Sequence, residues 1–69
     1  MKRYLTVIEK AGKNYSAYIP DIPGCVATGK TPEEVRQTIK EALDFHLEGL
    51  AEDGLKAPKA SAQAEYIAV

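Results

Sequence analysis

Apolar and polar residues alternate along the first third of the chain, which predicts short β-strands rather than helices. Residues 2–9 (KRYLTVIE) are rich in Tyr, Val, Ile and Thr and are expected to form a strand. Residues 10–14 (KAGKN) predict a turn in which Gly12 and Asn14 take positive φ values. A second strand is expected over 15–19 and a third over 25–28, with Pro20, Pro23 and Gly24 forming a sharp corner between them.

The spacing of apolar residues changes to three and four after residue 31, which predicts an amphipathic helix. The expected apolar stripe is Val35, Ile39, Ala42, Leu43, His46, Leu47 and Leu50. Thr31 is expected to be the N-cap and Pro32 the first helical residue, with Glu34 reaching back to complete a capping box. Gly54 is expected to end the helix.

The last residues predict a connector and a final strand. Residues 56–63 (KAPKASAQ) are polar and rich in alanine, whereas residues 64–69 (AEYIAV) have the composition of a strand. The expected fold is therefore α+β in the order βββαβ, with one antiparallel-rich sheet carrying one helix on one face. Residues 1–69 are expected to form a single domain.

The small size of the chain limits how it can be stabilised. A domain of 69 residues buries only about 60% of its unfolded surface, so its core is expected to need support. Cys25 is the only cysteine and His46 the only histidine, which excludes an internal disulfide and a four-ligand zinc site of Cys and His. Self-association as a dimer or larger even-numbered oligomer is the expected solution.

Charge and hydropathy exclude several partners. The formal net charge of −1, from 9 basic and 10 acidic residues, gives no electrostatic footprint for nucleic acid. No apolar run approaches the ~20 residues that span a membrane, so a soluble, cytoplasmic protein is expected. The tyrosines are expected to be packing residues of the sheet, because no cluster of Arg and Lys accompanies them for base stacking.

No catalytic or cofactor-binding constellation is visible, and no cofactor or metal is predicted. His46 lies within the apolar stripe and is expected to be a packed imidazole with one hydrogen-bonded nitrogen. Cys25 is expected to be a buried, inert thiol. The acidic residues of the helix spread over its polar face, either as a solvated face or as a docking face for a basic partner. As partner-binding residues we predict Asp21, Glu34, Glu41, Asp44 and Glu48.

Three segments, in this order and spacing, resemble the N-terminal domain of the HicB-type antitoxins. They are residues 15–25 (YSAYIPDIPGC), 27–34 (ATGKTPEE) and 39–50 (IKEALDFHLEGL). The resemblance implies a partly degraded ribonuclease H-like fold. It also implies a non-enzymatic antitoxin that binds and blocks HicA, a small mRNA-cleaving toxin that resembles a double-stranded-RNA-binding domain.

The resemblance leaves alternative functions and alternative docking surfaces open. Many HicB proteins carry a second, DNA-binding domain, which these 69 residues have no room for, so we expect no direct DNA binding. An orphan oligomeric relative without a toxin is one alternative. Another is a minimal metal-dependent nuclease, for which several acidic side chains would have to converge on one pocket. Docking of a partner through the 20–24 corner and the neighbouring strand edges is the alternative to docking through the acidic helix face.

Overall fold

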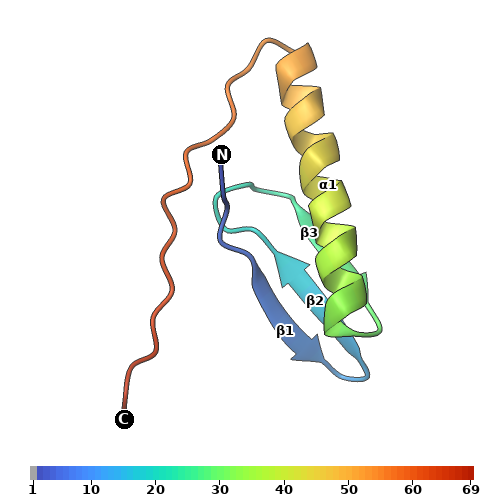
Figure 1. Cartoon of the computed structure of the whole chain (residues 1–69), viewed down its shortest axis with the longest axis vertical. Helices are drawn as coiled ribbons and strands as arrows, with labels where there is room; N and C mark the ends of the chain where they lie inside the picture. The colour runs from blue at the N-terminus through green and yellow to red at the C-terminus, as the bar shows by residue number, and fades with distance from the viewer. Residues whose placement is uncertain (1) are drawn as a thin grey trace.

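The computed structural model describes residues 2–69 as a three-stranded sheet covered on one face by one helix (Figure 1). The strands are β1 (Val7–Ala11), β2 (Asn14–Tyr18) and β3 (Val26–Gly29), and the helix is α1 (Pro32–Glu52). Both strand pairs are antiparallel, in the order β1-β2-β3. The α+β class, with a sheet and one covering helix, is confirmed. Residue 1 of the expected domain lies outside the described residues.

The hairpin of β1 and β2 begins later than its sequence predicted. Val7 pairs with Tyr18 and Ala11 with Asn14, so residues 2–6 lie before the ladder. Gly12 has a φ of 64°, whereas Asn14, also expected at positive φ, is the first residue of β2. A two-residue loop with glycine first is the form that matches the twist of paired strands.

Two consecutive turns form the corner between β2 and β3. The N–H of Ile22 donates to the oxygen of Ile19 at 3.0 Å, and the N–H of Cys25 donates to the oxygen of Ile22 at 3.1 Å. A proline follows the first residue of each turn, where its fixed φ is favourable, and Gly24 takes the φ of 83° that a side chain would oppose. The two prolines thus place three side chains in the core. These are Ile19, Ile22 and Cys25.

Both ends of α1 are capped. The Thr31 hydroxyl accepts a hydrogen bond from the Glu34 N–H at 3.0 Å, as predicted. The Glu34 carboxylate accepts from the N–H of Lys30 at 3.4 Å, so it reaches one residue further back than a standard capping box requires. At the other end Gly54 has a φ of 72°, and the N–H of Leu55 donates to the Leu50 oxygen at 2.9 Å, which forms a Schellman cap.

The core lies between α1 and the inner face of β2 and β3. Its buried residues are Ala17, Ile19, Ile22, Cys25, Val35 and Ile39. The two buried side chains of α1 belong to its first half, and the rest of the predicted stripe, including His46, is only half-buried. Within residues 2–69 the half-buried His46 side chain makes no hydrogen bond, so the one expected there is not seen.

Residues 64–69 do not form the predicted final strand. The chain after α1 is extended, passes the N-terminal segment and ends away from the sheet (Figure 1), and residues 64–69 join no ladder. Upstream of them, the Tyr4 hydroxyl donates to the oxygen of Pro58 at 2.6 Å. The composition of 64–69 favours a strand, but strand propensity expresses packing against neighbours, and here no neighbour is paired. The expected fifth element is therefore corrected to an unpaired extended segment.

Candidate protein-docking surfaces

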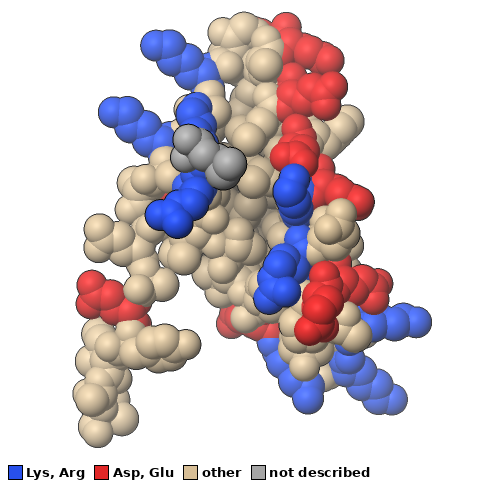
Figure 2. All heavy atoms as spheres, in the orientation of Figure 1, with Lys and Arg blue, Asp and Glu red and all other residues tan. Residues whose placement is uncertain are grey.

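Four of the five predicted partner-binding residues share the outer face of α1. Glu34, Glu41 and Glu48 recur every seven residues, so they form one row along the helix, and Asp44 lies beside Glu41 and Glu48. All four are exposed. Figure 2 shows acidic side chains gathered along α1, with basic side chains interrupting them midway. We call Glu34, Glu41, Asp44 and Glu48 the acidic row.

The contacts of the acidic row are weak and local. Lys40 pairs with Asp44 at 2.9 Å, and both side chains remain more than 60% exposed. Gln37 donates to Glu41 at 3.5 Å. Surface pairs of this kind contribute about 0–1 kcal/mol, so little holds these carboxylates in place. Glu34 also accepts a hydrogen bond from the N–H of Lys30, whereas Glu41 and Asp44 are held only by these surface pairs.

Asp21, the fifth predicted residue, has a different environment. Its carboxylate accepts hydrogen bonds from the N–H of Ala62 at 3.0 Å and from the N–H and hydroxyl of Ser61 at 3.0 and 3.1 Å. The bond from Ala62 and then those from Ser61 lower the pKa of the Asp21 carboxyl below its usual value, against a partial desolvation that raises it. Asp21 thus fastens the chain after α1 to the corner between β2 and β3. We call this set of contacts the Asp21 clasp.

Phe45 was missed by the sequence reading and lies on the same side of α1 as the acidic row. Its ring is 79% exposed, and it follows Glu41 by four residues and precedes Glu48 by three. An exposed aromatic ring among charged residues resembles the centre and rim of a protein interface. The signal was present in the sequence, because Phe45 is the large apolar residue of the helix that falls outside the three-and-four spacing.

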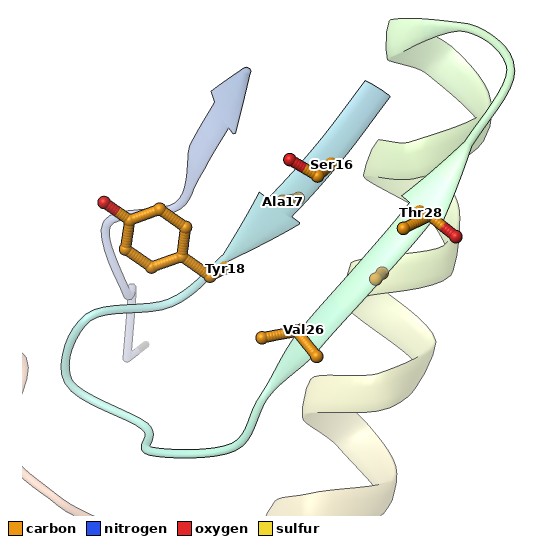
Figure 3. A pocket seen from close by; sticks show the side chains of 6 residues that line it. Ser16, Ala17, Tyr18, Val26 and Thr28 are labelled. Atoms are coloured by element: carbon orange, nitrogen blue, oxygen red, sulfur yellow. The ribbon is translucent and has the colours of Figure 1, made fainter. Parts of the chain in front are cut away.

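The outer face of the sheet is a second candidate surface. The register places Val7, Tyr18 and Val26 in one row across the three strands. Val26 is 65% exposed, and Tyr18 and Val26 stand on neighbouring strands beside a shallow groove of about 440 Å³ (Figure 3). Ser16 and Thr28 line the same groove. This face is less charged than the outer face of α1 and would suit an apolar contact.

Cys25 is the one cysteine of the chain. Cys25 is buried, and desolvation raises the pKa of its thiol, which disfavours the nucleophilic thiolate. Across residues 2–69 no three His, Cys, Asp or Glu side chains lie together as a metal site would need. No helix in this range is long and apolar enough to cross a membrane.

Comparison with known proteins identifies a solved structure and several proteins that are similar to this chain. A chain of a solved HicA3 and HicB3 toxin-antitoxin complex has the same fold, with a TM-score of 0.71 and 30% identity over 87% of this chain and 70% of that one. A UPF0150 protein of Helicobacter pylori is 45% identical over 49 residues, which is 71% of this chain and 68% of that protein. A UPF0150 protein of Thermoplasma acidophilum is 34% identical over 62 residues, which is 88% of this chain and 90% of that protein.

A longer relative comes from a phage. An uncharacterised 14.9 kDa protein from the rep-hol intergenic region of Haemophilus phage HP1 is 41% identical over 64 residues, 93% of this chain. The chain spans about half the length of that relative, 48%. Residues 4–69 match the family described as the HicB_like antitoxin of bacterial toxin-antitoxin systems. Since the match extends over nearly the whole sequence, the chain belongs to the HicB-like antitoxin family.

Proposed function

We propose that this chain is a non-enzymatic antitoxin module that binds a HicA-type mRNA-cleaving toxin and blocks it. The observation that carries the proposal is the family match over residues 4–69, together with the likeness to a chain of a toxin-antitoxin complex. The bacterial cytoplasm, where mRNA is translated, is the location that this activity requires. We also propose that the module associates with itself, because only six of the described residues 2–69 are buried in its core.

The acidic row is the proposed docking surface for the toxin. An enzyme that holds RNA phosphates needs cationic side chains at its active surface. Four exposed carboxylates along one face of α1 complement such a surface, and Phe45 offers an apolar contact among them. We leave Asp21 out of this docking surface, because its oxygens accept hydrogen bonds from Ser61 and Ala62.

The test uses a HicA-type toxin encoded beside the gene of this chain, with mRNA cleavage and binding kinetics as readouts. Glu41, Asp44 and Glu48 are changed together to Lys. Association with the toxin should slow at least ~10-fold at low salt and lose its salt dependence, because complementary charge mainly accelerates encounter. The fold should persist, since all three side chains are exposed, and circular dichroism checks this.

Two further variants test how strongly association depends on charge and whether the outer sheet face takes part in it. Changing the same residues to Gln, Asn and Gln should give an intermediate association rate. Changing Tyr18 and Val26 to Ser tests the outer sheet face and should leave association unchanged. An association rate insensitive to salt and to the triple reversal, but lowered by the sheet-face variant, would contradict docking through the acidic row. A toxin that cleaves mRNA equally well with the wild-type chain present would contradict the antitoxin role itself.

A further inference from the structure

A groove between β1 and α1 lacks a cover. Helix α1 lies mainly over β3 and β2, which leaves the inner side of β1 open along one flank of the helix (Figure 1). The groove has a volume of about 330 Å³. Its apolar lining comes from Ile8, Ile19, Ile39 and Leu43. Arg36 adds positive charge to the same groove, and so does Lys40, which is also paired with Asp44 on the surface of α1. The site therefore suits a segment that carries both apolar side chains and a carboxylate.

The chain itself contains a segment of that chemistry with no partner of its own. Residues 64–69 are extended and exposed, with Ile67 at 81% exposure and Tyr66 and Val69 fully exposed. In an extended segment alternate side chains share a face, so Glu65, Ile67 and Val69 point the same way. This face offers two branched apolar side chains and one carboxylate, the same classes of group that the groove would bind.

The backbone requirements match as well. β1 has one neighbour in the sheet, β2, so its other edge has unpaired N–H and C=O groups. Six extended residues span about 20 Å and the five residues of β1 about 17 Å. Residues 64–69 therefore have the length to pair along the whole of β1 while Ile67 and Val69 enter the groove beside it.

Within one chain, residues 64–69 and the β1–α1 groove remain apart. The Asp21 clasp and the Tyr4–Pro58 hydrogen bond hold residues 58–62 across the corner and the N-terminal segment. After that point the chain leaves residues 64–69 in solvent and the groove uncovered. A second copy related by a two-fold axis can supply the missing strand and receive one in return. Such an exchange satisfies two strand edges and two grooves at once.

We propose that two copies of this chain assemble by exchanging residues 64–69, each segment pairing with β1 of the other copy and filling its β1–α1 groove. Ile67 and Val69 occupy the apolar floor, and Glu65 meets Arg36 and Lys40. Tyr66, on the opposite face of the added strand, extends the row of Val7, Tyr18 and Val26 on the outer side of the sheet. The proposal rests on the self-association suggested above and specifies its contacts.

The first test measures dimerisation of the full chain by light scattering and sedimentation over a concentration series. Ile67→Asp should weaken the dimer at least ~100-fold, because each dimer loses two buried isoleucines and would bury two carboxylates instead. Ala68→Asp is the matched control, with the same new charge one residue away on the solvent side of the strand. It should leave the dimerisation constant within ~3-fold of the wild-type value, as surface changes do.

The second test distinguishes exchange between copies from pairing within one copy. Arg36→Cys and Glu65→Cys are made on separate chains, which are mixed and then oxidised. A disulfide-linked dimer of the two variants is the expected product, and native Cys25, being buried, should not take part. A chain carrying both substitutions that closes an internal disulfide, and stays monomeric, would overturn the exchange.

The other outcomes are equally decisive. A dimer that resists Ile67→Asp would overturn the exchange while leaving self-association in place. A chain that is monomeric throughout the micromolar range would overturn both. Neither result would bear on toxin binding, which is measured separately through mRNA cleavage.

Discussion

At the scale of single residues, the function of a carboxylate depends on what it accepts hydrogen bonds from. From the sequence, Glu41, Glu48 and Asp21 were predicted together as partner-binding residues because of their charge alone. The structure separates them, because the glutamates are exposed on α1 whereas Asp21 receives three hydrogen bonds from Ser61 and Ala62. Those donors follow it by forty and forty-one positions in the chain. No local pattern could have indicated the pairing.

The helix cap, by contrast, is a local feature and can be tested as one. Thr31→Ala should lower the free energy of unfolding by about 1 kcal/mol, because the N–H of Glu34 loses its acceptor. Denaturant unfolding measures the change. Thr31→Ser keeps the hydroxyl and should be nearly neutral. A loss below ~0.3 kcal/mol for the alanine variant would mean that the hydrogen bond adds little beyond solvation by water.

At the scale of elements, the helix was predictable and the last strand was not. The cap at Thr31, the three-and-four spacing and the stop at Gly54 are all local signals, and each is confirmed. The first three strands were predicted, but they begin and end at other residues than expected, since a strand extends only as far as its neighbour pairs with it. The strand propensity of residues 64–69 is equally clear in the sequence, but a strand also needs a partner, and within one chain these residues pair with none. Sequence periodicity does not contain that information.

The contact between β3 and α1 makes a prediction about two glycines. A Cβ on Gly29 would lie 2.8 Å from the backbone nitrogen of Val35, so Gly29→Ala must push the strand away from the first turn of the helix. We expect a loss of about 1–3 kcal/mol in the free energy of unfolding.

Gly49→Ala is the matched control for this contact. Nothing lies within 4 Å of a Cβ at Gly49, and alanine favours the helix by up to about 1 kcal/mol, so this variant should be more stable than the wild type. Denaturant unfolding of both variants gives the comparison. Equal stability of the two would contradict a close approach of β3 to α1.

At the scale of the whole molecule, a small core leaves several surfaces available for partners. Among residues 2–69, six buried residues hold α1 to the sheet, while the acidic row, the outer sheet face and the β1–α1 groove all face solvent. The proposed functions use different surfaces: the acidic row for the toxin and the groove for a second copy. The two kinds of binding can therefore take place together, and a dimer would present two acidic rows.

The Asp21 clasp is a contact between single residues that affects the whole molecule. It fastens residues 61 and 62 to the domain and so determines where residues 64–69 begin. Since hydrogen bonds from Ala62 and Ser61 lower the pKa of the Asp21 carboxyl, the clasp favours its ionised form. The contribution of the clasp is therefore present above the ordinary pKa of 3.8 and is lost as the pH falls through the lower value of the folded state. At neutral pH the clasp is closed.

Acidification should thus release Ser61 and Ala62 from Asp21 before the domain unfolds. In a pH titration followed by amide NMR, the signals of Ser61 and Ala62 should move towards disordered values at the acid end, while those of the buried Val35 and Ile39 stay in place. Asp21→Asn should show the released signals already at neutral pH, because the amide is a weaker acceptor than the carboxylate. Asp53→Asn is the control, since Asp53 contacts the helix end through its backbone N–H. Signals of Ser61 and Ala62 that are unchanged in the Asp21 variant would show that the Tyr4–Pro58 hydrogen bond alone fastens this part of the chain.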